Sequence, residues 1–401
     1  MAGQPLLEAL FASEFVNGYV NAYDPYASVE PTDLAEKLLA LPVTRTFNYG
    51  VEISPEKDGA YVKSVTLNSP AFWADVRQYD RVVAINGMPI ESLDLEQAAA
   101  LALQKEIDLE VTRNNKKMVL KLHSVMQSES KSDFSVVTWR GQNYIRLELH
   151  TFQADVNLCV AISQKIKSES KKRSISGVIL DLRNNGGGRV AFVKCIATIF
   201  LGPSQLVATE MPLDKGQNSE KWYTWSKEEI TKFKLYTNNQ TPMVVLINGK
   251  SASGSELLAG ALRDHFRAWN VGLLTYGKGS VNGGSTYSIN NKFTEYKTVA
   301  LFYQPNGTSN ELVGIIPDFV IPSRPSATDD EDYFERNYDE HPDLPFKVNE
   351  ASRPPRTNEI SKINNCIDQS FLSAKQSEIE GGRVGADFQL YNALEVLRCD
   401  K

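Results

Sequence analysis

Two short apolar segments constrain the fold of this chain more than any other feature of its sequence. Residues 177–182 and 242–248 are near-continuous apolar runs, a pattern typical of strands buried on both faces of a parallel sheet. Residues 144–152 form a further predicted strand, and helical patterns alternate with these strands at residues 155–168, 189–200 and 254–266. Because parallel strands need long crossover connections, this alternation predicts an α/β domain.

The chain has 401 residues, a length that predicts two or three domains. Short alternating apolar runs separated by Asp-Gly and Asn-Gly turns predict a small β module with one helix at residues 94–104. Its predicted strands are residues 51–53, 61–65, 81–85, 109–112 and 118–122. The predicted domains are an N-terminal helical region (1–45), the β module (46–126), the α/β core (127–325) and a tail (326–401) with an acidic run and a final helix at 388–397.

Composition excludes several classes of protein. With 43 basic and 49 acidic residues the net charge is −6, which is the wrong sign for a general nucleic-acid binder. No apolar run is long enough to span a bilayer, and the start of the chain lacks the pattern of a secretory signal. We therefore expect either that the protein is cytosolic or that a secretory signal is missing from this sequence.

The four cysteines are too few for a disulfide scaffold and show no zinc-binding spacing. Cys159 and Cys195 lie in apolar, helical surroundings, where we expect inert core thiols. Cys366 and Cys399 share the tail and could form a bridge, which would favour an oxidising compartment. We expect no metal and no other cofactor.

The densest chemical signal follows the strand at 242–248. Ser253 stands where that strand gives way to a helix, and Glu256 follows three residues later. The pair fits a capping box, in which serine and glutamate satisfy free amides at the start of a helix. The same geometry would expose the Ser253 hydroxyl as a nucleophile at the positive end of a helix dipole.

A nucleophilic serine needs a base, and lysine is a candidate here. None of the four histidines lies in a motif, and His265 is about 18 Å from Ser253 along the predicted helix. A Ser-His arrangement therefore stays open but unsupported. Lys278 stands between two glycines, which allow the close backbone approach that desolvates an amine. To act near pH 7, its pKa must fall by about three units from about 10.4.

Two glycine-rich segments could bind an anion. The spacing from Gly272 to Lys278 matches most of a phosphate-binding loop, but Gly279 replaces the required hydroxyl residue and predicted strands follow. The run from Gly186 to Gly188 ends a buried strand and precedes a helix, so its backbone amides could face an anion.

These segments together resemble the carboxyl-terminal processing peptidases, also called tail-specific proteases. The resemblance rests on Leu-Arg-Asn-Asn-Gly-Gly-Gly (182–188), Ser-Ala-Ser-Gly-Ser-Glu (251–256) and Tyr-Gly-Lys-Gly-Ser-Val (276–281). It implies an α/β fold with a ClpP/crotonase-like peptidase core, an inserted, mostly-β PDZ domain and N-terminal helices. It also implies a serine endopeptidase that cleaves protein substrates near their C-termini.

The resemblance assigns roles by position. Ser253 would be the nucleophile and Lys278 the base, with oxyanion amides from Gly187 or Gly188 and from Gly254. Asp264 would have a supporting role. Asn282 stands where the family usually has the glutamine that orients the lysine.

The β module would be the PDZ domain, which binds a peptide as an added strand. Tyr49, Gly50 and Val51 would hold the substrate tail, and residues 93–102 would form the other groove wall. A catalytically silent PDZ scaffold and a Ser-His hydrolase of small esters are the alternatives. The family implies the bacterial periplasm or cell envelope, protein or peptide substrates, and leaves an adaptor protein and a homo-oligomer open.

Overall fold

The central element of the fold is a six-stranded sheet with the order β10-β11-β12-β15-β16-β19. In the computed structural model its strands are β10 (Ser132–Trp139), β11 (Gln142–Leu149), β12 (Gly177–Asp181), β15 (Met243–Ile247), β16 (Trp269–Gly272) and β19 (Phe319–Val320). Strands β10 and β11 are antiparallel, and the strands from β11 to β19 are parallel. The predicted α/β core is confirmed, and it includes the strand β10, which the sequence patterns did not predict.

The structure describes residues 27–31, 47–56, 59–65, 69–77, 79–92, 101, 104–123, 125–126, 131–214, 216–285, 293–323, 356–370, 372–373 and 387–400. Most of the predicted N-terminal helical region, most of the helix at 94–104 and the acidic run lie outside these residues. The part of residues 1–45 that is described includes a strand, β1 (Ser28–Pro31), which no sequence pattern predicted.

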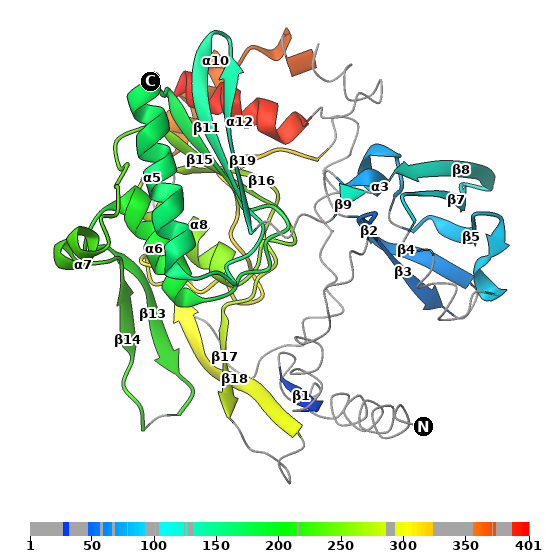
Figure 1. The fold of residues 1–401 in the computed structure, drawn as a ribbon, viewed down its shortest axis with the longest axis horizontal. Helices are drawn as coiled ribbons and strands as arrows, with labels where there is room; N and C mark the ends of the chain where they lie inside the picture. The colour runs from blue at the N-terminus through cyan, green and yellow to red at the C-terminus, as the bar shows by residue number, and fades with distance from the viewer. Residues whose placement is uncertain are drawn as a thin grey trace.

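Each face of the central sheet is covered by helices (Figure 1). Helices α5 (Val156–Lys172), α6 (Val190–Leu201) and α8 (Gly254–Asp264) share one hydrophobic core with Val178, Leu180 and Val245. Helices α10 (Thr357–Cys366) and α12 (Phe388–Cys399) share the other with Ile179, Val244 and Leu246. Because alternate residues of a strand point to opposite faces, burial of both faces explains the continuous apolar runs.

Helix α12 is part of the second of these two hydrophobic cores. Ala393, Leu394, Val396 and Leu397 have no exposed surface, and the ring of Trp139 stacks on that of Tyr391 at 5.2 Å. The predicted helix at 388–397 is confirmed, and the sheet depends on it for burial of its second face.

Two disulfides tie pairs of helices together. Cys159 of α5 is bonded to Cys195 of α6, so our expectation of two inert thiols was wrong. Helical periodicity identified both as buried positions, but the pairing depends on how the two helices pack side by side. Cys366 of α10 is bonded to Cys399 of α12, the bridge that the sequence left open.

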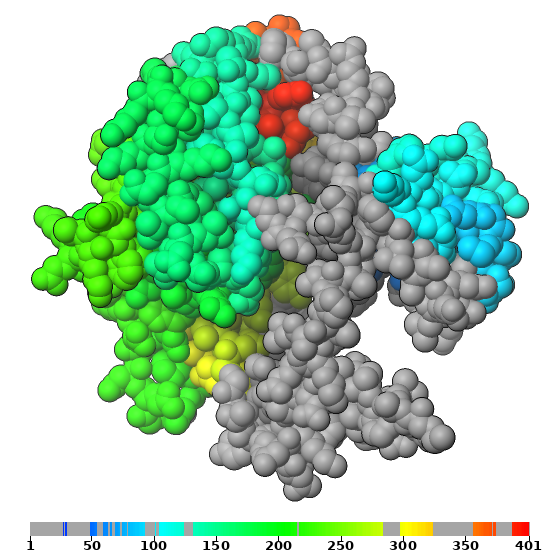
Figure 2. Space-filling model, in the orientation of Figure 1, coloured from blue at the N-terminus to red at the C-terminus, as the bar shows by residue number. Residues whose placement is uncertain are grey.

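A second sheet is built around one long strand. Strand β18 (Phe293–Tyr303) pairs with β17 (Ser280–Ser285), β1 and β13 (Leu206–Pro212), and β13 pairs with β14 (Glu220–Tyr223). The short helix α7 (Lys227–Lys232) follows β14. In Figure 2 the region of β13 and β14 forms a green projection at the lower left of the molecule. Strand β17 begins two residues after Lys278, so this sheet is joined directly to a predicted site segment.

The β module contains its own sheet, with the order β3-β4-β5-β7-β8. These strands are β3 (Val51–Glu56), β4 (Gly59–Val65), β5 (Arg81–Ile85), β7 (Glu106–Arg113) and β8 (Lys116–His123). All five predicted strands are confirmed, and β3 lies at the edge of the sheet. None of the helices that the structure describes is both long and apolar enough to cross a membrane.

Candidate active site

Ser253 lies at the junction between β15 and α8. It is the N-cap residue of α8 and has a φ of 53°, a left-handed conformation that is uncommon for residues other than glycine. Such strain is maintained only where the surrounding structure fixes the backbone. The sharp turn places a half-buried serine between two buried neighbours, Ala252 and Gly254, at the start of a helix.

The glycine turn after β12 packs directly against this serine. A Cβ atom on Gly187 (φ 99°) would lie 2.7 Å from the nitrogen of Gly254 and 2.9 Å from the Cβ of Ser253. A Cβ atom on Gly188 (φ 144°) would lie 2.4 Å from the carbonyl carbon of Phe152. Both positions therefore require glycine, because a side chain at Gly187 would clash with the start of α8 and one at Gly188 would clash with the backbone after β11.

Two backbone amides of this region are free among the described residues, those of Gly188 and Gly254. The nitrogen of Gly188 lies 3.4 Å from the position that a Cβ on Gly254 would take. The amide of Gly187 is different, because it donates to Oδ1 of Asn185 at 2.9 Å. Free amides beside a serine at a helix N-terminus are suited to stabilising a negatively charged oxygen.

Asn185 holds the glycine turn against α8. Its buried side chain donates to the carbonyl of Leu149 at 2.8 Å. Its own carbonyl accepts from the amide of Ala252 at 3.0 Å and from the hydroxyl of Ser255 at 2.6 Å. The residue thus connects three strand ends, those of β11, β12 and β15.

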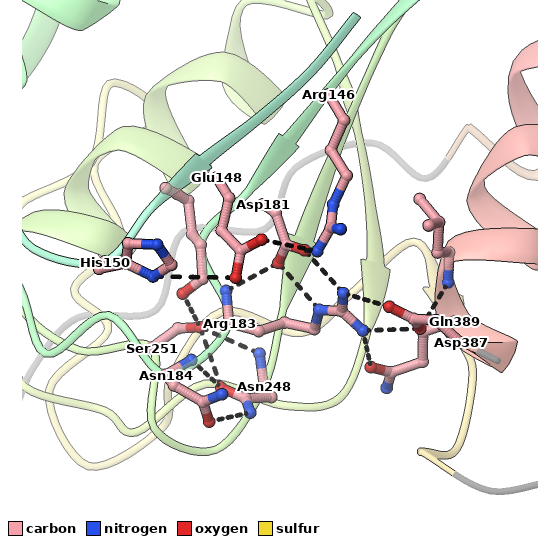
Figure 3. Close-up of polar contacts among 12 residues, drawn as sticks. Arg146, Glu148, His150, Asp181, Arg183, Asn184, Asn248, Ser251, Asp387 and Gln389 are labelled. Carbon is pink, nitrogen blue, oxygen red and sulfur yellow. Dashed lines mark hydrogen bonds and ion pairs between the residues drawn. The ribbon is translucent and has the colours of Figure 1, made fainter. Parts of the chain in front are cut away.

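A second clamp joins the same two loops one residue earlier (Figure 3). The amide of Asn184 donates to Oδ1 of Asn248 at 2.9 Å, and Nδ2 of Asn248 donates to Oδ1 of Asn184 at 2.9 Å. The hydroxyl of Ser251 donates to the carbonyl of Leu182 at 2.8 Å. The loops after β12 and β15 therefore form one rigid unit.

A buried network of charges holds the end of β12, just before the glycine turn (Figure 3). The side chains of Asp181 and Arg183 are 2% exposed and are joined by a 2.6 Å ion pair. The same guanidinium binds Asp387, the N-cap residue of α12, at 2.7 Å. Arg146 contacts both Asp181 and Glu148 at 2.8 Å. The C-terminal helix is thus linked to the loop that carries the glycines.

Burial and charge act in opposite directions on the acids of this network. Burial raises the pKa of Asp181, but the guanidinium groups of Arg183 and Arg146 outweigh it and hold that pKa well below its usual value. The pKa of Glu148 is raised, first by burial and then by the neighbouring charge of Asp181. The two carboxylates therefore differ in acidity, although Arg146 contacts both.

Glu256 joins the serine segment to the lysine segment. One carboxylate oxygen accepts from the amides of Ser253 at 2.9 Å and Lys278 at 2.8 Å. The other accepts from the amide of Gly277 at 2.7 Å and the hydroxyl of Thr275 at 2.6 Å. Burial raises the pKa of Glu256, against the effect of these four hydrogen bonds. The predicted cap thus also anchors the loop that carries Lys278.

Lys278 and Asn282 lie on the segment that leads into β17. Lys278 is half-buried and stands between Gly277 (φ 95°) and Gly279, and Asn282 is exposed in β17 opposite Thr298. A strand follows Lys278 where a phosphate-binding loop has a helix.

Asp264 is the last residue of α8, about 16 Å from Ser253 along the helix axis. Its carboxylate pairs with Arg263 at 3.0 Å and accepts from the amide and side chain of Asn306. The structure therefore places Asp264 away from the serine, as a residue that fixes the loop after β18.

The described histidines form contacts elsewhere. His265 is bonded to the carbonyl of Leu206, His150 to Asp133, and His123 to Glu106. His341 lies outside the described residues. No described group of three His, Cys, Asp or Glu side chains is arranged to bind a metal ion.

In the β module, the predicted peptide-binding segment precedes the edge strand. The carbonyl of Tyr49 accepts from the amide of Ala71 at 2.9 Å, and that of Gly50 (φ 71°) accepts from Ser69 at 3.3 Å. Val51 begins β3. Nearly all of the other predicted wall (93–102) lies outside the described residues.

Sequence reasoning missed the residues that hold the site together. Asn184, Asn185 and Ser251 lie within the predicted motifs and Asn248 ends a predicted strand, but none was assigned a role, and the link from Glu256 to Lys278 was not predicted. Asparagine and serine at loop ends commonly bond to nearby backbone groups, and this signal could have identified them. Asp387 has the local signal of a helix N-cap, but its pairing with Arg183 had none, because the two residues are far apart in the sequence.

Comparison with known proteins gives two matches to family models. Residues 144–321 match the model of peptidase family S41, and residues 48–123 match the PDZ domain. The first match contains every candidate catalytic and oxyanion residue described above. The second contains Tyr49, Gly50 and Val51.

Two curated relatives are both named as proteases that process carboxyl termini. The chain is 28% identical over 322 residues to a carboxy-terminal-processing protease of Bartonella bacilliformis, covering 76% of this chain and 68% of that protein. It is 30% identical over 285 residues to a carboxyl-terminal-processing protease of Synechocystis sp., covering 68% of this chain and 61% of that protein. The chain thus spans about two thirds of their length.

A solved structure, the photosystem II D1 C-terminal processing protease, has a similar fold. The two share 23% sequence identity with a TM-score of 0.50, over 75% of this chain and 78% of that one.

Proposed function

The chain belongs to peptidase family S41 through residues 144–321 and carries a PDZ domain over residues 48–123, and from this premise we propose that it is a serine endopeptidase with a Ser-Lys dyad. It cleaves protein substrates near their C-termini. The observation that carries the proposal is the position of Ser253, a strained residue beside two free amides and joined through Glu256 to the lysine loop.

In the proposed reaction, neutral Lys278 removes the proton from the Ser253 hydroxyl as its oxygen attacks the scissile carbonyl. The resulting oxyanion is stabilised by the amides of Gly188 and Gly254. Gly187 contributes close packing instead of a hydrogen bond, because its amide already donates to Asn185. Lys278 then protonates the leaving amine, and water attacks the acyl-enzyme to release the second product.

Two further residues have structural roles in this proposal. Asn282, four residues after the lysine, orients its amine from β17. Asp264 fixes the far end of α8 through its contacts with Arg263 and Asn306. Neither residue takes part in proton transfer.

The PDZ domain recruits the substrate tail. Strand β3 is at the sheet edge, where an extended peptide can add as a further strand. Tyr49, Gly50 and Val51 form the entrance to that edge. An adaptor protein and a homo-oligomer remain predictions.

The two disulfides support an oxidising compartment, because cytosolic proteins rarely keep such bonds. We place the protein in the bacterial periplasm or cell envelope. Expression with and without export, followed by thiol counting, tests this location.

The function is tested by digestion of an unstructured protein such as casein, with mass spectrometry to locate the cuts. Wild type is compared with Ser253→Ala, Lys278→Ala and the double variant, with Lys171→Ala on α5 as the surface control. Each dyad substitution should abolish cleavage, and the double variant should be no worse, because the pair acts as a unit. Cleavage by Lys278→Ala at the wild-type rate would exclude the dyad.

A serine-reactive phosphonate distinguishes the enzyme from a silent PDZ scaffold. The enzyme should be labelled at Ser253, and labelling should disappear in Ser253→Ala. Peptide binding without cleavage or labelling would support the scaffold.

A further inference from the structure

Three consecutive backbone amides around Lys278 donate to buried carboxylates. The amides of Gly277 and Lys278 donate to Glu256 of α8 at 2.7 and 2.8 Å. The next amide, that of Gly279, donates to Oε2 of Glu311 at 2.6 Å. The two acids come from different parts of the chain, so separate segments bind the backbone before and after the lysine.

The segment that carries Glu311 packs closely on this loop. The amide of Leu312 donates to the carbonyl of Gly277 at 2.9 Å, on the other side of the lysine. A Cβ on Gly279 would lie 2.7 Å from the nitrogen of Glu311 and 2.8 Å from Oγ of Ser309. Glu311 is itself buried, with 2% of its surface exposed.

We propose that Glu311 is a positioning residue for the base: its carboxylate fixes the Gly279 amide and thereby the placement of Lys278 relative to Ser253. This inference rests on the proposed function. Glu311 acts through the loop backbone and takes no part in the reaction itself.

The chemistry of the contact explains why an acid is found here. A hydrogen bond from an amide to an ionised carboxylate is shorter and stronger than one between neutral groups. Lys278 has a long flexible side chain, so its placement depends on a rigid backbone. A displacement of about 1 Å at a reacting group can reduce the rate about 100-fold.

Two conservative substitutions of Glu311 distinguish the effect of its side-chain length from the effect of its charge. Glu311→Gln keeps the length and an oxygen acceptor but loses the charge. Glu311→Asp keeps the charge but is one methylene too short to reach the Gly279 amide. Asp318→Asn is the matched control, because Asp318 accepts the amide of Asn270 at 2.8 Å on the same segment but away from the lysine.

The expected result is a fall in kcat of about 10-fold or more for Glu311→Asp with an unchanged KM, and at most about a 3-fold change for Glu311→Gln. Asp318→Asn should retain the wild-type kcat. A wild-type kcat in Glu311→Asp, or a larger loss in Glu311→Gln than in Glu311→Asp, would overturn the proposal.

Hydrogen exchange provides a readout that does not depend on cleavage. The amides of residues 277–279 should exchange faster in Glu311→Asp than in wild type, and by a smaller factor in Glu311→Gln, whose neutral oxygen still accepts the bond but more weakly. Equal exchange in all three proteins would refute the positioning role. A wild type that does not cleave casein would instead refute the proposed function.

Discussion

Gly187 packs so closely on Gly254 that a Cβ atom on the first would lie 2.7 Å from the backbone nitrogen of the second. This contact sets the distance between the turn after β12 and the first amide of α8. The proposed oxyanion site lies where these two backbones meet, so its geometry depends on the absence of a side chain at position 187.

Gly187→Ala should therefore lower kcat by about 100-fold or more, the loss expected when one oxyanion donor is misplaced. The positive φ of 99° adds strain, and we expect about 1–3 kcal/mol of lost stability. Gly186→Ala is the matched control, because a Cβ there has no neighbour within 4 Å. Casein digestion and thermal unfolding measure both effects, and equal rates for the two variants would contradict the packing argument.

Glu256→Gln should impair activity despite its similar shape. One oxygen of Glu256 accepts from Ser253 and Lys278, and the other accepts from Gly277 and Thr275. An amide group can satisfy only one of these pairs, and each buried donor left without an acceptor costs about 1–3 kcal/mol. We expect a loss of kcat of about 100-fold, accompanied by a lower melting temperature.

The control for this substitution is Glu229→Gln, which alters a capping box on the surface helix α7. Glutamine also serves at that position of a capping box, so this variant should match wild type in both measurements. Full activity in Glu256→Gln would show that the four hydrogen bonds do not determine the geometry of the active site.

Asp181→Asn should destabilise the protein in a pH-dependent manner. Arg183 and Arg146 hold the pKa of Asp181 well below its unfolded value, so the ionised carboxylate stabilises the fold at pH values above about 4. This contribution is lost as the pH falls toward the folded pKa. Loss of one partner of a buried ion pair costs about 3–5 kcal/mol at neutral pH.

Urea unfolding at several pH values measures this effect. The difference in unfolding free energy between wild type and Asp181→Asn should be largest near pH 7 and should shrink below about pH 4. Asp368→Asn, which removes an exposed partner of Arg140, should give a small difference. A difference for Asp181→Asn that stays constant from pH 7 to pH 2 would exclude the linkage.

The two disulfides should differ in their resistance to reduction. Cys366 is exposed, whereas Cys159 and Cys195 have no exposed surface. Mild reductant followed by an alkylating reagent should modify Cys366 and Cys399 first, as mass spectrometry can show. Prior modification of Cys159 would contradict the burial of that pair.

Loss of the Cys366–Cys399 bond should also reduce stability. The bond closes a loop with a sequence separation of 33 residues between the helices that cover the second sheet face. Replacement of both cysteines by serine should cost about 2–4 kcal/mol in the free energy of unfolding.

Much of the fold followed from local patterns. The apolar runs at 177–182 and 242–248 are buried strands, and the segment from Ser253 onward is a strand-to-helix junction with Glu256 at the third helical position. Each of these features involves residues close together in the chain. Periodicity and capping rules describe such local interactions, and for this reason they were reliable here.

Contacts between distant segments could not be obtained in this way. The pairing of Cys159 with Cys195 was missed, because a buried cysteine has the same helical spacing whether it is bonded or free. The strand β1 was missed, because its partner β18 lies more than 250 residues away. The pairing of Arg183 with Asp387 had no local signal either.

The sequence by itself determined which residue types stand at the ends of the strands: a serine, a lysine and three glycines in recognisable spacing. Only the tertiary structure decided that the glycine turn packs on the first residue of α8, because Gly187 and Gly254 are far apart in the sequence. The tertiary structure also decided which acids hold the lysine loop. The physical reason is that a hydrogen bond depends on distances of a few tenths of an ångström between segments, and these distances arise only when the sheet and helices pack.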